Sequence, residues 1–358
     1  MSQATNSQAP SIVWTDAARQ IQFNHWLARI TPEHALEPGS LRLASADASF
    51  RRYFRVDSVA GSRIIMDAPP ERENCQPFVK VAALMQQAGL HVPQVLAWDE
   101  ALGFMLLTDL GGQTMMQVVE PTQPQANLPL YLQAVDTLIT WQLASRAGVL
   151  PAYDEAILRR ELELFPDWYL QQHKGQAIGA EMRATLDRSF GQIITANLAQ
   201  PAVFVHRDFM PRNLMAPAAP GAPLGVLDFQ DALYGPITYD IASLMRDAFL
   251  SWDEDFCLDV TVRYWQQARR AGLPVGEDFG EFYRAVEWMG LQRHLKVAGI
   301  FARLTLRDGK PQYLADTHRF IHYIRATCGR YRELKPLLRL IDQVEGIVEP
   351  DIFGFGRQ

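Results

Sequence analysis

The chain has 358 residues, 48% of them hydrophobic, which is enough apolar material for a large core divided between more than one compact unit. Its 34 basic and 40 acidic residues give a formal charge of -6 without any basic run, which argues against a nucleic-acid partner. The three cysteines lie far apart and lack zinc-ligand spacing, as is typical of thiols in a reducing compartment.

The first residues, "MSQATNSQAPS", are polar and do not resemble a signal peptide. No apolar stretch approaches the roughly 18 residues that a membrane span needs. We therefore expect a cytoplasmic protein without a membrane span. The sequence does not indicate an oligomeric state.

The N-terminal part has the pattern of short strands. "RYFRV" (52–56) and "SRIIMDA" (62–68) are rich in β-branched and aromatic residues, and "DSVAGS" between them predicts a hairpin. A helix is predicted over 76–87, where apolar residues recur at helical spacing. Two more strands, at 94–98 and 103–110, complete a small, mostly antiparallel sheet with one helix.

Beyond residue 110 the helical period dominates, apart from one interruption at 201–236. There, short apolar runs alternate with loops, including the Pro/Ala-rich "APAAPGAP". The predicted helices after the first helical run cover 154–172, 178–198, 238–250, 253–271, 277–305 and 311–327.

The interruption carries the residues with the clearest chemical meaning. "VFVHRDFMPRNLM" (203–215) holds His206, Asp208 and Asn213, and "GVLDFQDALYGPITYDIA" adds Asp228 and Asp240. Mg²⁺ prefers oxygen ligands beside substrate phosphates, and a separate Asp can orient an attacking hydroxyl. The pattern matches the H-R-D-x4-N loop of kinases, whereas their D-F-G reads D-F-Q here. The alternative is a core histidine, a turn aspartate and a capping asparagine.

These segments resemble the aminoglycoside phosphotransferase and choline kinase group of small-molecule kinases. "LRLASADASFRRYFRV", "RIIMDAPPERE" and "FMLLTDLGGQTM" are more narrowly similar to bacterial kinases that phosphorylate the anomeric hydroxyl of N-acetylmuramate and N-acetylglucosamine in peptidoglycan recycling. The resemblance implies ATP and Mg²⁺ as cofactors and a small sugar as substrate. It also implies an α+β, bilobal, protein-kinase-like fold, with an N-lobe at 1–110 and a mainly helical C-lobe at 111–358 that holds a catalytic loop (204–215) and a metal loop (225–236).

By the same resemblance, Asp208 is the catalytic base, and Asn213 and Asp228 are the Mg²⁺ ligands. His206 is a scaffold of the catalytic loop, and Asp240 braces that loop by hydrogen bonds. A plain helix-start carboxylate at residue 240 would make nearly the same contacts.

The nucleotide site departs from the family pattern. Met66 stands where the family has its third-strand lysine, so another cation is expected to bind the phosphates: Arg52, Arg55, Arg63 or Lys80. The implied hinge residues near adenine are Asp109 and Leu110. The place of the glycine-rich phosphate loop is taken by small residues whose backbone N–H groups could approach phosphate: Ser45, Ala46, Asp47, Ala48 and Ser49.

The acceptor site has weaker signals. N-acetylmuramate is an anion, so its site should offer arginine or lysine, and Arg212 and Arg293 are the candidates. Gln230 and Asp231 could bond sugar hydroxyls or the N-acetyl group. Trp168 could stack on a sugar face, although aromatic residues at helical spacing are more often part of a core.

Two other functions remain open. One keeps the chemistry but uses another small acceptor, such as an amino alcohol or an aminoglycoside. The other is a nucleotide-binding pseudokinase, favoured by the missing lysine and opposed by the intact Asp208, Asn213 and Asp228. A protein kinase is disfavoured because no A-P-E segment is present.

Overall fold

The computed structural model describes residues 12–46 and 50–348, and the chain divides into two compact units. The sheet unit comprises Met1–Val118 and Arg212–Asp231, and the helical unit comprises Val119–Pro211 and Ala232–Gln358. The segment 212–231, which the sequence analysis assigned to the C-lobe, therefore belongs to the sheet unit. The lobe boundary at residue 110 stays a prediction.

The sheet unit is built on five antiparallel strands in the order β1-β2-β3-β5-β4. The hairpin predicted around residue 60 is present, since β2 pairs with β3 from Arg52↔Asp67 to Val56↔Arg63. The four strands expected here are confirmed, each within about two residues. The strands run over Leu36–Ala46 (β1), Arg52–Ser58 (β2), Arg63–Asp67 (β3), Val95–Asp99 (β4) and Phe104–Thr108 (β5).

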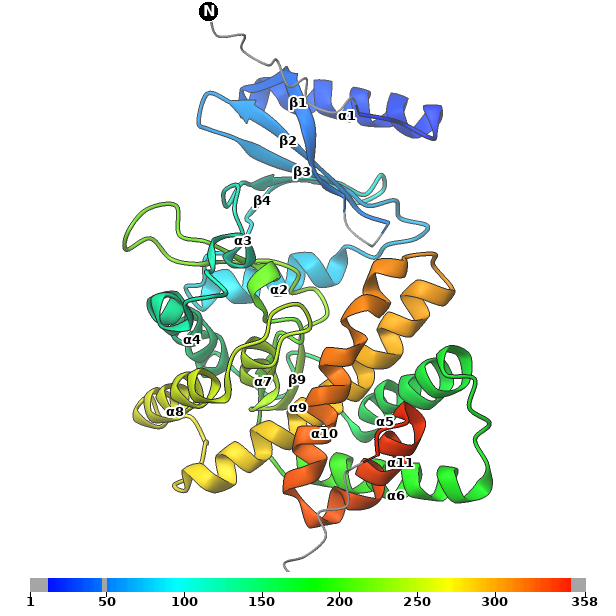
Figure 1. Ribbon diagram of the computed structural model, residues 1–358. Coiled ribbons are helices and arrows are strands. Elements are labelled where there is room, and N and C mark those ends of the chain that lie inside the picture. Colours follow the sequence, from blue (N-terminus) through cyan, green and yellow to red (C-terminus); the bar gives the residue numbers. More distant parts are fainter. Residues whose placement is uncertain (1–11, 47–49, 349–358) are drawn as a thin grey trace, which may run out of the picture. The chain divides into compact units, whose positions relative to one another are not determined.

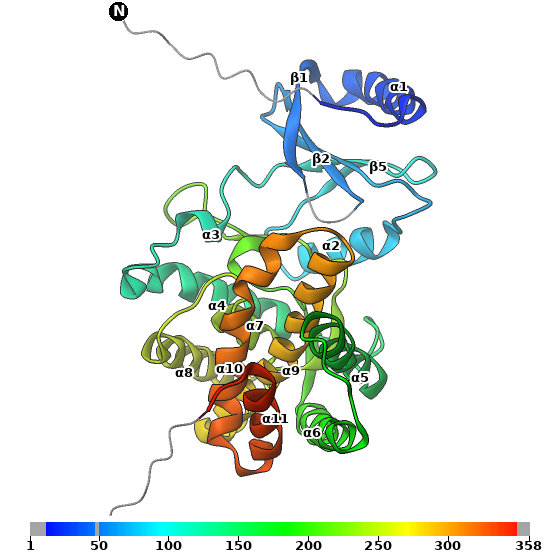
Figure 2. The same cartoon turned by 45° about the vertical axis from the view of Figure 1, so that its right-hand side comes forward.

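One face of this sheet is covered by α1 (Ala17–His34), as Figures 1 and 2 show. The helix begins after Asp16, whose side chain accepts hydrogen bonds from the first turn. Apolar residues at helical spacing pack on the sheet: Phe23, Trp26, Leu27 and Ile30 against Phe54, Val56, Ile65, Phe104 and Leu106. The prediction of a single helix beside this sheet was therefore wrong, since α1 accompanies it as well. The helical spacing of the apolar residues in α1 is visible in the sequence.

The predicted helix at 76–87 is confirmed as α2 (Gln76–Gln87). Its buried face consists of Phe78, Val81, Ala82 and Met85, which lie at helical spacing. The ring of Phe78 stacks on Phe229 with a centroid distance of 5.0 Å. The helix is thereby joined to the returning segment 212–231 of the same unit.

That returning segment forms a short hairpin of β7 (Leu214–Met215) and β8 (Gly225–Val226). A Cβ atom at Gly225 would lie 2.9 Å from both the Leu110 side chain and the Met215 Cβ atom. Glycine is needed here because the chain after β5 passes directly over β8. The short helix α3 (Met115–Val118) also packs against β7.

The helical unit is organised around α9 (Phe279–Leu306), which α5, α6, α7 and α10 contact (Figure 2). A two-stranded antiparallel sheet of β6 (Ala202–Val205) and β9 (Leu233–Pro236) interrupts the helices, as the lost period at 201–236 predicted. The remaining helices are α4 (Leu128–Leu143), α5 (Glu155–Leu164), α6 (Ala180–Leu198), α7 (Tyr239–Met245), α8 (Glu254–Arg270), α10 (Thr317–Arg330) and α11 (Lys335–Glu345). Shorter 3₁₀ turns cover Pro124–Asn127, Pro211–Asn213, Pro311–Asp316 and Arg332–Leu334.

Three helix predictions need correction. The single helix expected over 154–172 is α5 followed by a π-helix, Phe165–His173, because Pro166 has no N–H for the α-helical ladder. The helix expected over 238–250 ends at Met245, and Asp247 then bonds the Phe249 N–H in a turn. The helix expected over 311–327 starts as a 3₁₀ turn. None of the helices in residues 12–46 and 50–348 combines the length and apolar character needed to cross a membrane.

Candidate active site

The catalytic loop leaves the end of β6 in the helical unit, directly before His206. Asp240, in the first turn of α7, accepts hydrogen bonds from the backbone N–H groups of His206 (2.7 Å) and Arg207 (3.0 Å). The Asp240 carboxyl is fully buried, and burial raises its pKa, while the nearby His206 and the two N–H groups favour its charged form. Asp240 therefore holds the backbone of the two residues that precede Asp208.

His206 has a structural place inside the loop. It is buried, and its Nδ1 atom accepts a hydrogen bond from the Asp208 N–H at 3.2 Å. The imidazole also lies edge-on to Phe209, with ring centroids 5.7 Å apart. These contacts hold the backbone of Asp208, while the scaffold role implied for His206 stays a prediction.

Arg207 is the most constrained residue of the loop. Its φ angle is 79°, in the left-handed region that non-glycine residues seldom adopt. Its guanidinium bonds Glu161 of α5 at 2.5 Å, and its carbonyl oxygen accepts a hydrogen bond from Arg293 of α9 at 2.7 Å. Helices α5 and α9 therefore hold the strained turn that presents Asp208.

Glu161 is the centre of a buried charge cluster. Besides Arg207, it contacts Lys296 Nζ at 3.0 Å and the hydroxyl of Tyr153. Burial opposes its charge, but the Lys296 and Arg207 cations outweigh that cost and lower the pKa of Glu161. We call Glu161, Arg207, Lys296 and Tyr153 the loop-support cluster.

Arg293, a predicted sugar ligand, lies beneath the loop. Its side chain is buried, and its guanidinium lies 4.6 Å from the ring centroid of Tyr239. Burial opposes the charge, but Tyr239 and Asp208 are among the groups that raise the pKa of Arg293. The structure thus gives Arg293 a contact with the loop backbone, and sugar binding by it stays a prediction.

The two proposed metal ligands lie in the sheet unit. Asn213 precedes β7 and Asp228 follows β8, and the Leu227 N–H bonds the Asn213 carbonyl oxygen at 2.9 Å. The Asn213 amide nitrogen lies 3.3 Å from Asp228 Oδ2. Asp228 has a φ angle of 62°, so its backbone is also in the left-handed region.

This pair fits a magnesium ion. Adjacent ligands of an octahedron with bonds of about 2.1 Å lie about 3 Å apart, close to the separation of Asn213 and Asp228. A half-turn of the Asn213 amide exchanges its nitrogen for its oxygen. One carboxylate and one amide oxygen leave room for the waters and phosphate oxygens that Mg²⁺ prefers. Within the described residues no cluster of three His, Cys, Asp or Glu residues offers another metal site.

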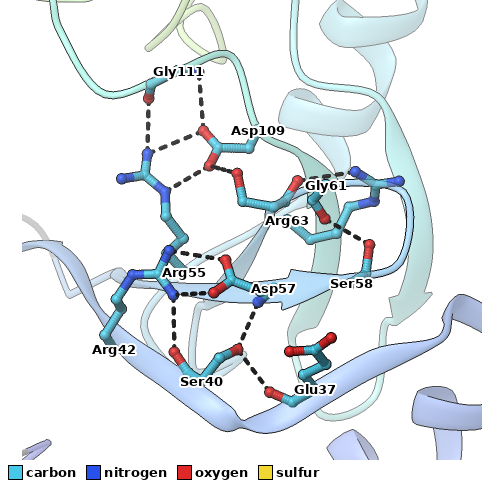
Figure 3. Close-up of polar contacts among 11 residues, drawn as sticks. Glu37, Ser40, Arg42, Arg55, Asp57, Ser58, Gly61, Arg63, Asp109 and Gly111 are labelled. Carbon is cyan, nitrogen blue, oxygen red and sulfur yellow. Dashed lines mark hydrogen bonds and ion pairs between the residues drawn. The ribbon is translucent and has the colours of Figure 1, made fainter.

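The expected hinge is anchored by an ion pair (Figure 3). Arg55 of β2 bonds both carboxylate oxygens of Asp109, at 2.6 and 3.0 Å, and the carbonyl oxygen of Gly111 at 2.8 Å. Ser62 also donates to Asp109. Burial opposes the charge of Asp109, but these hydrogen bonds outweigh it and lower its pKa. Leu110 is buried, and contact of either residue's backbone with adenine stays a prediction.

The other nucleotide residues fall in different places. Asp47, Ala48 and Ser49 lie outside the described residues, and Ser45 and Ala46 end β1. Arg52 bonds Asp67 at 2.6 Å and lies over Trp14, on the face of the sheet that α1 covers. The bond to Asp67 accounts for the position of the Arg52 side chain, and no phosphate contact is needed to explain it.

Of the remaining acceptor candidates, three belong to the sheet unit and one, Trp168, belongs to the helical unit. Arg212 and Asp231 are exposed, and Gln230 donates a hydrogen bond to Asp228 at 2.8 Å. Trp168 is half-buried on the π-helix. None of these positions tests sugar binding, so all four assignments stay predictions.

The sequence analysis missed the loop-support cluster. Its signal is a charged residue on an apolar helix face: Glu161 lies beside Leu158 and Leu162, both buried, in α5. Lys296 lies in the same way within the long buried stretch of α9. Charges at core positions are costly unless they are paired, so such positions predict partners.

Comparison with known protein families identifies the family of this chain. The model of the phosphotransferase enzyme family matches residues 40–277, more than half of the chain. The chain belongs to the phosphotransferase enzyme family. The match includes the predicted catalytic loop, the two proposed metal ligands and the five strands apart from the first residues of β1.

Two relatives are similar over nearly their whole length. The chain is 50% identical over 334 residues to the N-acetylmuramate/N-acetylglucosamine kinase of Pseudomonas aeruginosa, covering 91% of this chain and 97% of that protein. It is 48% identical over 330 residues to the kinase of the same name from Neisseria meningitidis serogroup B, covering 92% and 96%.

Solved structures confirm the protein-kinase-like fold. An ethanolamine kinase of Plasmodium vivax matches with a TM-score of 0.60 at 11% identity, over 94% of this chain and 93% of that one. An ADP-bound aminoglycoside phosphotransferase matches with a TM-score of 0.56 at 14% identity, over 86% and 97%. At these identities the likeness concerns the fold alone.

Proposed function

We propose that the protein transfers the γ-phosphoryl group of ATP to the anomeric hydroxyl of N-acetylmuramate or N-acetylglucosamine. The observation that carries the proposal is the 50% identity, over 91% of the chain, to a kinase named for these two sugars. The motif His206–Asp208–Asn213, followed by Asp228, provides the residue types that phosphoryl transfer needs. The sugar 1-phosphate would then enter peptidoglycan recycling.

Asp208 is the proposed base. It accepts a hydrogen bond from the anomeric hydroxyl, orients that oxygen toward the γ-phosphorus, and takes its proton as the new P–O bond forms and the bond from the γ-phosphorus to the bridging oxygen of ADP breaks, which releases ADP. An anomeric hydroxyl is more acidic than an ordinary alcohol, so modest assistance suffices. Mg²⁺, when bound by Asn213 and Asp228, supplies positive charge beside the phosphates.

Contacts of the loop-support cluster, Asp240 and Arg293 support the position of Asp208. Asp240 accepts hydrogen bonds from the backbone N–H groups of residues 206 and 207. Glu161 bonds the side chain of Arg207, and Arg293 bonds its carbonyl oxygen. A loop fixed by buried charges does not need to reorganise when the substrate binds.

The test is an ADP-release assay on the purified protein with Mg-ATP and separate acceptors. The panel contains N-acetylmuramate, N-acetylglucosamine, choline and an aminoglycoside. Turnover with either amino sugar is the expected result. Turnover with the cationic acceptors alone would keep the chemistry and replace the substrate. Binding of ADP without turnover on any acceptor would favour a pseudokinase, which the Met66 position makes the specific alternative.

A further inference from the structure

The third strand lacks the cation that the family resemblance implies, and the structure shows what stands there instead. Met66 of β3 is fully buried, between Tyr53 of β2 and Met105 of β5 in the register of the sheet. The cluster under α1 uses Phe54, Ile65 and other residues of the alternate set. Tyr53 and Met66 therefore lie on the opposite face.

The four cations that the sequence analysis named for this role have different surroundings. Arg52 bonds Asp67, and Arg55 bonds Asp109 and Gly111 (Figure 3). Arg63 bonds the carbonyl oxygen of Ser62 at 2.9 Å. The fourth, Lys80, is exposed on α2.

A fifth cation, Arg51, has the surroundings expected of the missing lysine. It precedes β2, two residues before Tyr53, and its side chain is only 10% exposed. Its guanidinium lies 3.0 Å from a carboxylate oxygen of Glu73. Burial opposes the charge, but Tyr53 and Glu73 outweigh it and raise the pKa of Arg51. The sheet unit thus contains a buried cation–glutamate pair on the side of Tyr53.

Glu73 connects this pair with α2. Its backbone N–H bonds the Pro69 carbonyl oxygen at 2.9 Å in the turn after β3, three residues before α2 begins at Gln76. Phe78 in the first turn of α2 stacks on Phe229, the residue after Asp228. One short helix therefore joins the carboxylate that holds Arg51 to the segment that holds the proposed metal ligand.

We infer that Arg51, oriented by Glu73, binds the phosphates of the nucleotide and takes the place of the third-strand lysine. A guanidinium suits this role because its planar set of N–H donors can bond a carboxylate and a phosphate at the same time. The inference rests on the proposed function, since it requires a nucleoside triphosphate as the phosphoryl donor. An arginine from the start of β2 would then do what a lysine on β3 does elsewhere in the family.

The competing explanation is a pair that merely stabilises the entry to α2. That explanation predicts a loss of stability on substitution, with equal effects on every ligand. A phosphate contact predicts a selective loss, because adenosine has no phosphate and ADP has two. The comparison of these two ligands separates the explanations without any measurement of turnover.

The experiment is calorimetric titration of the full chain with adenosine, ADP and ATP, each with Mg²⁺, for wild type, Arg51→Gln and Glu73→Gln. We expect Arg51→Gln to weaken ADP binding about 10- to 100-fold, the size of a charge-assisted hydrogen bond, and adenosine binding less than about twofold. Glu73→Gln should weaken ADP about three- to tenfold by releasing Arg51. Arg42→Gln is the control, since it breaks a more exposed Arg–Asp pair of the same sheet, at 2.9 Å (Figure 3).

Other outcomes overturn the inference. One is an unchanged ratio of ADP to adenosine affinity in both variants. Another is an equal loss of affinity for the two ligands. A third is a selective loss of ADP affinity in Arg52→Gln instead of Arg51→Gln. If Arg51→Gln fails to fold by circular dichroism, Glu73→Gln decides by the same ratio. Wild-type protein that binds ADP no better than adenosine would count against the proposed function itself. If the wild-type protein turns over an amino sugar and both variants bind ADP as tightly as wild type, the inference about Arg51 is wrong and the proposed function stands.

Discussion

The catalytic loop of the helical unit and the metal segment of the sheet unit hold their carboxylates in different ways. In the helical unit, Glu161 is surrounded by two cations and a tyrosine, and Asp240 is fully buried against backbone N–H groups. In the sheet unit, Asp228 is half-buried after a two-residue strand, and its partners include the neutral amides of Asn213 and Gln230.

The difference follows from what each carboxylate is proposed to do. A buried carboxylate that fixes a loop must be paired permanently, because an unpaired charge in a core is costly. A carboxylate that is to receive Mg²⁺ is better placed among neutral groups, since a protein cation there would compete with the ion. The comparison therefore predicts that replacing Glu161 or Asp240 lowers the free energy of unfolding, and that replacing Asp228 weakens ligand binding.

The largest effect is expected from Asp208→Asn, which removes the proposed base while keeping the shape. Turnover should fall about 100- to 10,000-fold, and ADP affinity should stay within about twofold, because the metal and nucleotide residues are untouched. Steady-state kinetics and ADP titration measure both quantities. Asp187→Asn, an exposed carboxylate of α6, is the control. Retained turnover in Asp208→Asn would remove Asp208 from its role.

Glu161→Gln tests the loop-support cluster. It leaves Arg207 and Lys296 without their shared carboxylate, so the free energy of unfolding should fall by about 3 kcal/mol. Turnover should fall as well, because the strained Arg207 turn is released. Urea unfolding and kinetics provide the readouts. Glu163, like Glu161, lies on α5, and Glu163→Gln loses a half-exposed pair with Arg183 of α6, so it should cost less than about 1 kcal/mol. Equal costs for the two variants would contradict the special place of Glu161.

Gly225→Ala tests the support of the metal segment. The added methyl group would meet Leu110 and Met215 at 2.9 Å, so the chain after β5 and strand β8 must separate. We expect a loss of about 1–3 kcal/mol in unfolding free energy, with weaker ADP binding. Gly112→Ala is the matched control, because a Cβ atom there has nothing within 4 Å. If both variants behave alike, close packing at residue 225 is not required.

The smallest effect concerns pH and the helical unit. Burial and the charge of Arg246 lower the pKa of His294 to about 3, so it stays neutral in the folded protein while the unfolded chain takes up a proton near pH 6.5. A base whose pKa is lower in the folded than in the unfolded protein stabilises the folded state at high pH. This stabilisation is lost as the pH falls below about 6.5. The loss from His294 between pH 7.5 and 5.5 should be about 1 kcal/mol.

Urea unfolding at the two pH values measures this loss. His294→Phe keeps an aromatic ring beside Tyr323, whose ring centroid lies 4.6 Å from that of His294. The variant should lose about 1 kcal/mol less stability than wild type between pH 7.5 and 5.5. His318→Gln, at an exposed position, serves as the control. An unchanged slope in His294→Phe would show that His294 is not the group that titrates.

The sequence was most informative where the chain obeys a short pattern. The strands of the sheet unit, α2 and the catalytic motif all follow from periodicity or spacing, and each lies within a few residues of its predicted position. The ends of α5 at Leu164 and of α7 at Met245 were less visible, because they depend on the N–H that Pro166 lacks and on one hydrogen bond to Asp247.

The charged partners could not be read from spacing. Glu161 and Arg207 are 46 residues apart, and Arg51 and Glu73 are 22 apart, so only the tertiary structure brings each pair together. A cation was predicted in the nucleotide site from Arg52, Arg55, Arg63 or Lys80, all of which lie on or after the second strand. The role inferred for Arg51 depends on its pairing with Glu73, and that pairing cannot be seen in the sequence.

The most direct test of the account is the phosphorus NMR spectrum of the products that the wild-type protein forms from ATP with N-acetylmuramate and, separately, with N-acetylglucosamine; Asp208→Asn is the blank. The account predicts a sugar phosphate resonance coupled to the anomeric proton, and its absence with the variant over the same time. A phosphate on another hydroxyl, or no sugar phosphate from either sugar with protein that binds ADP, would contradict the account.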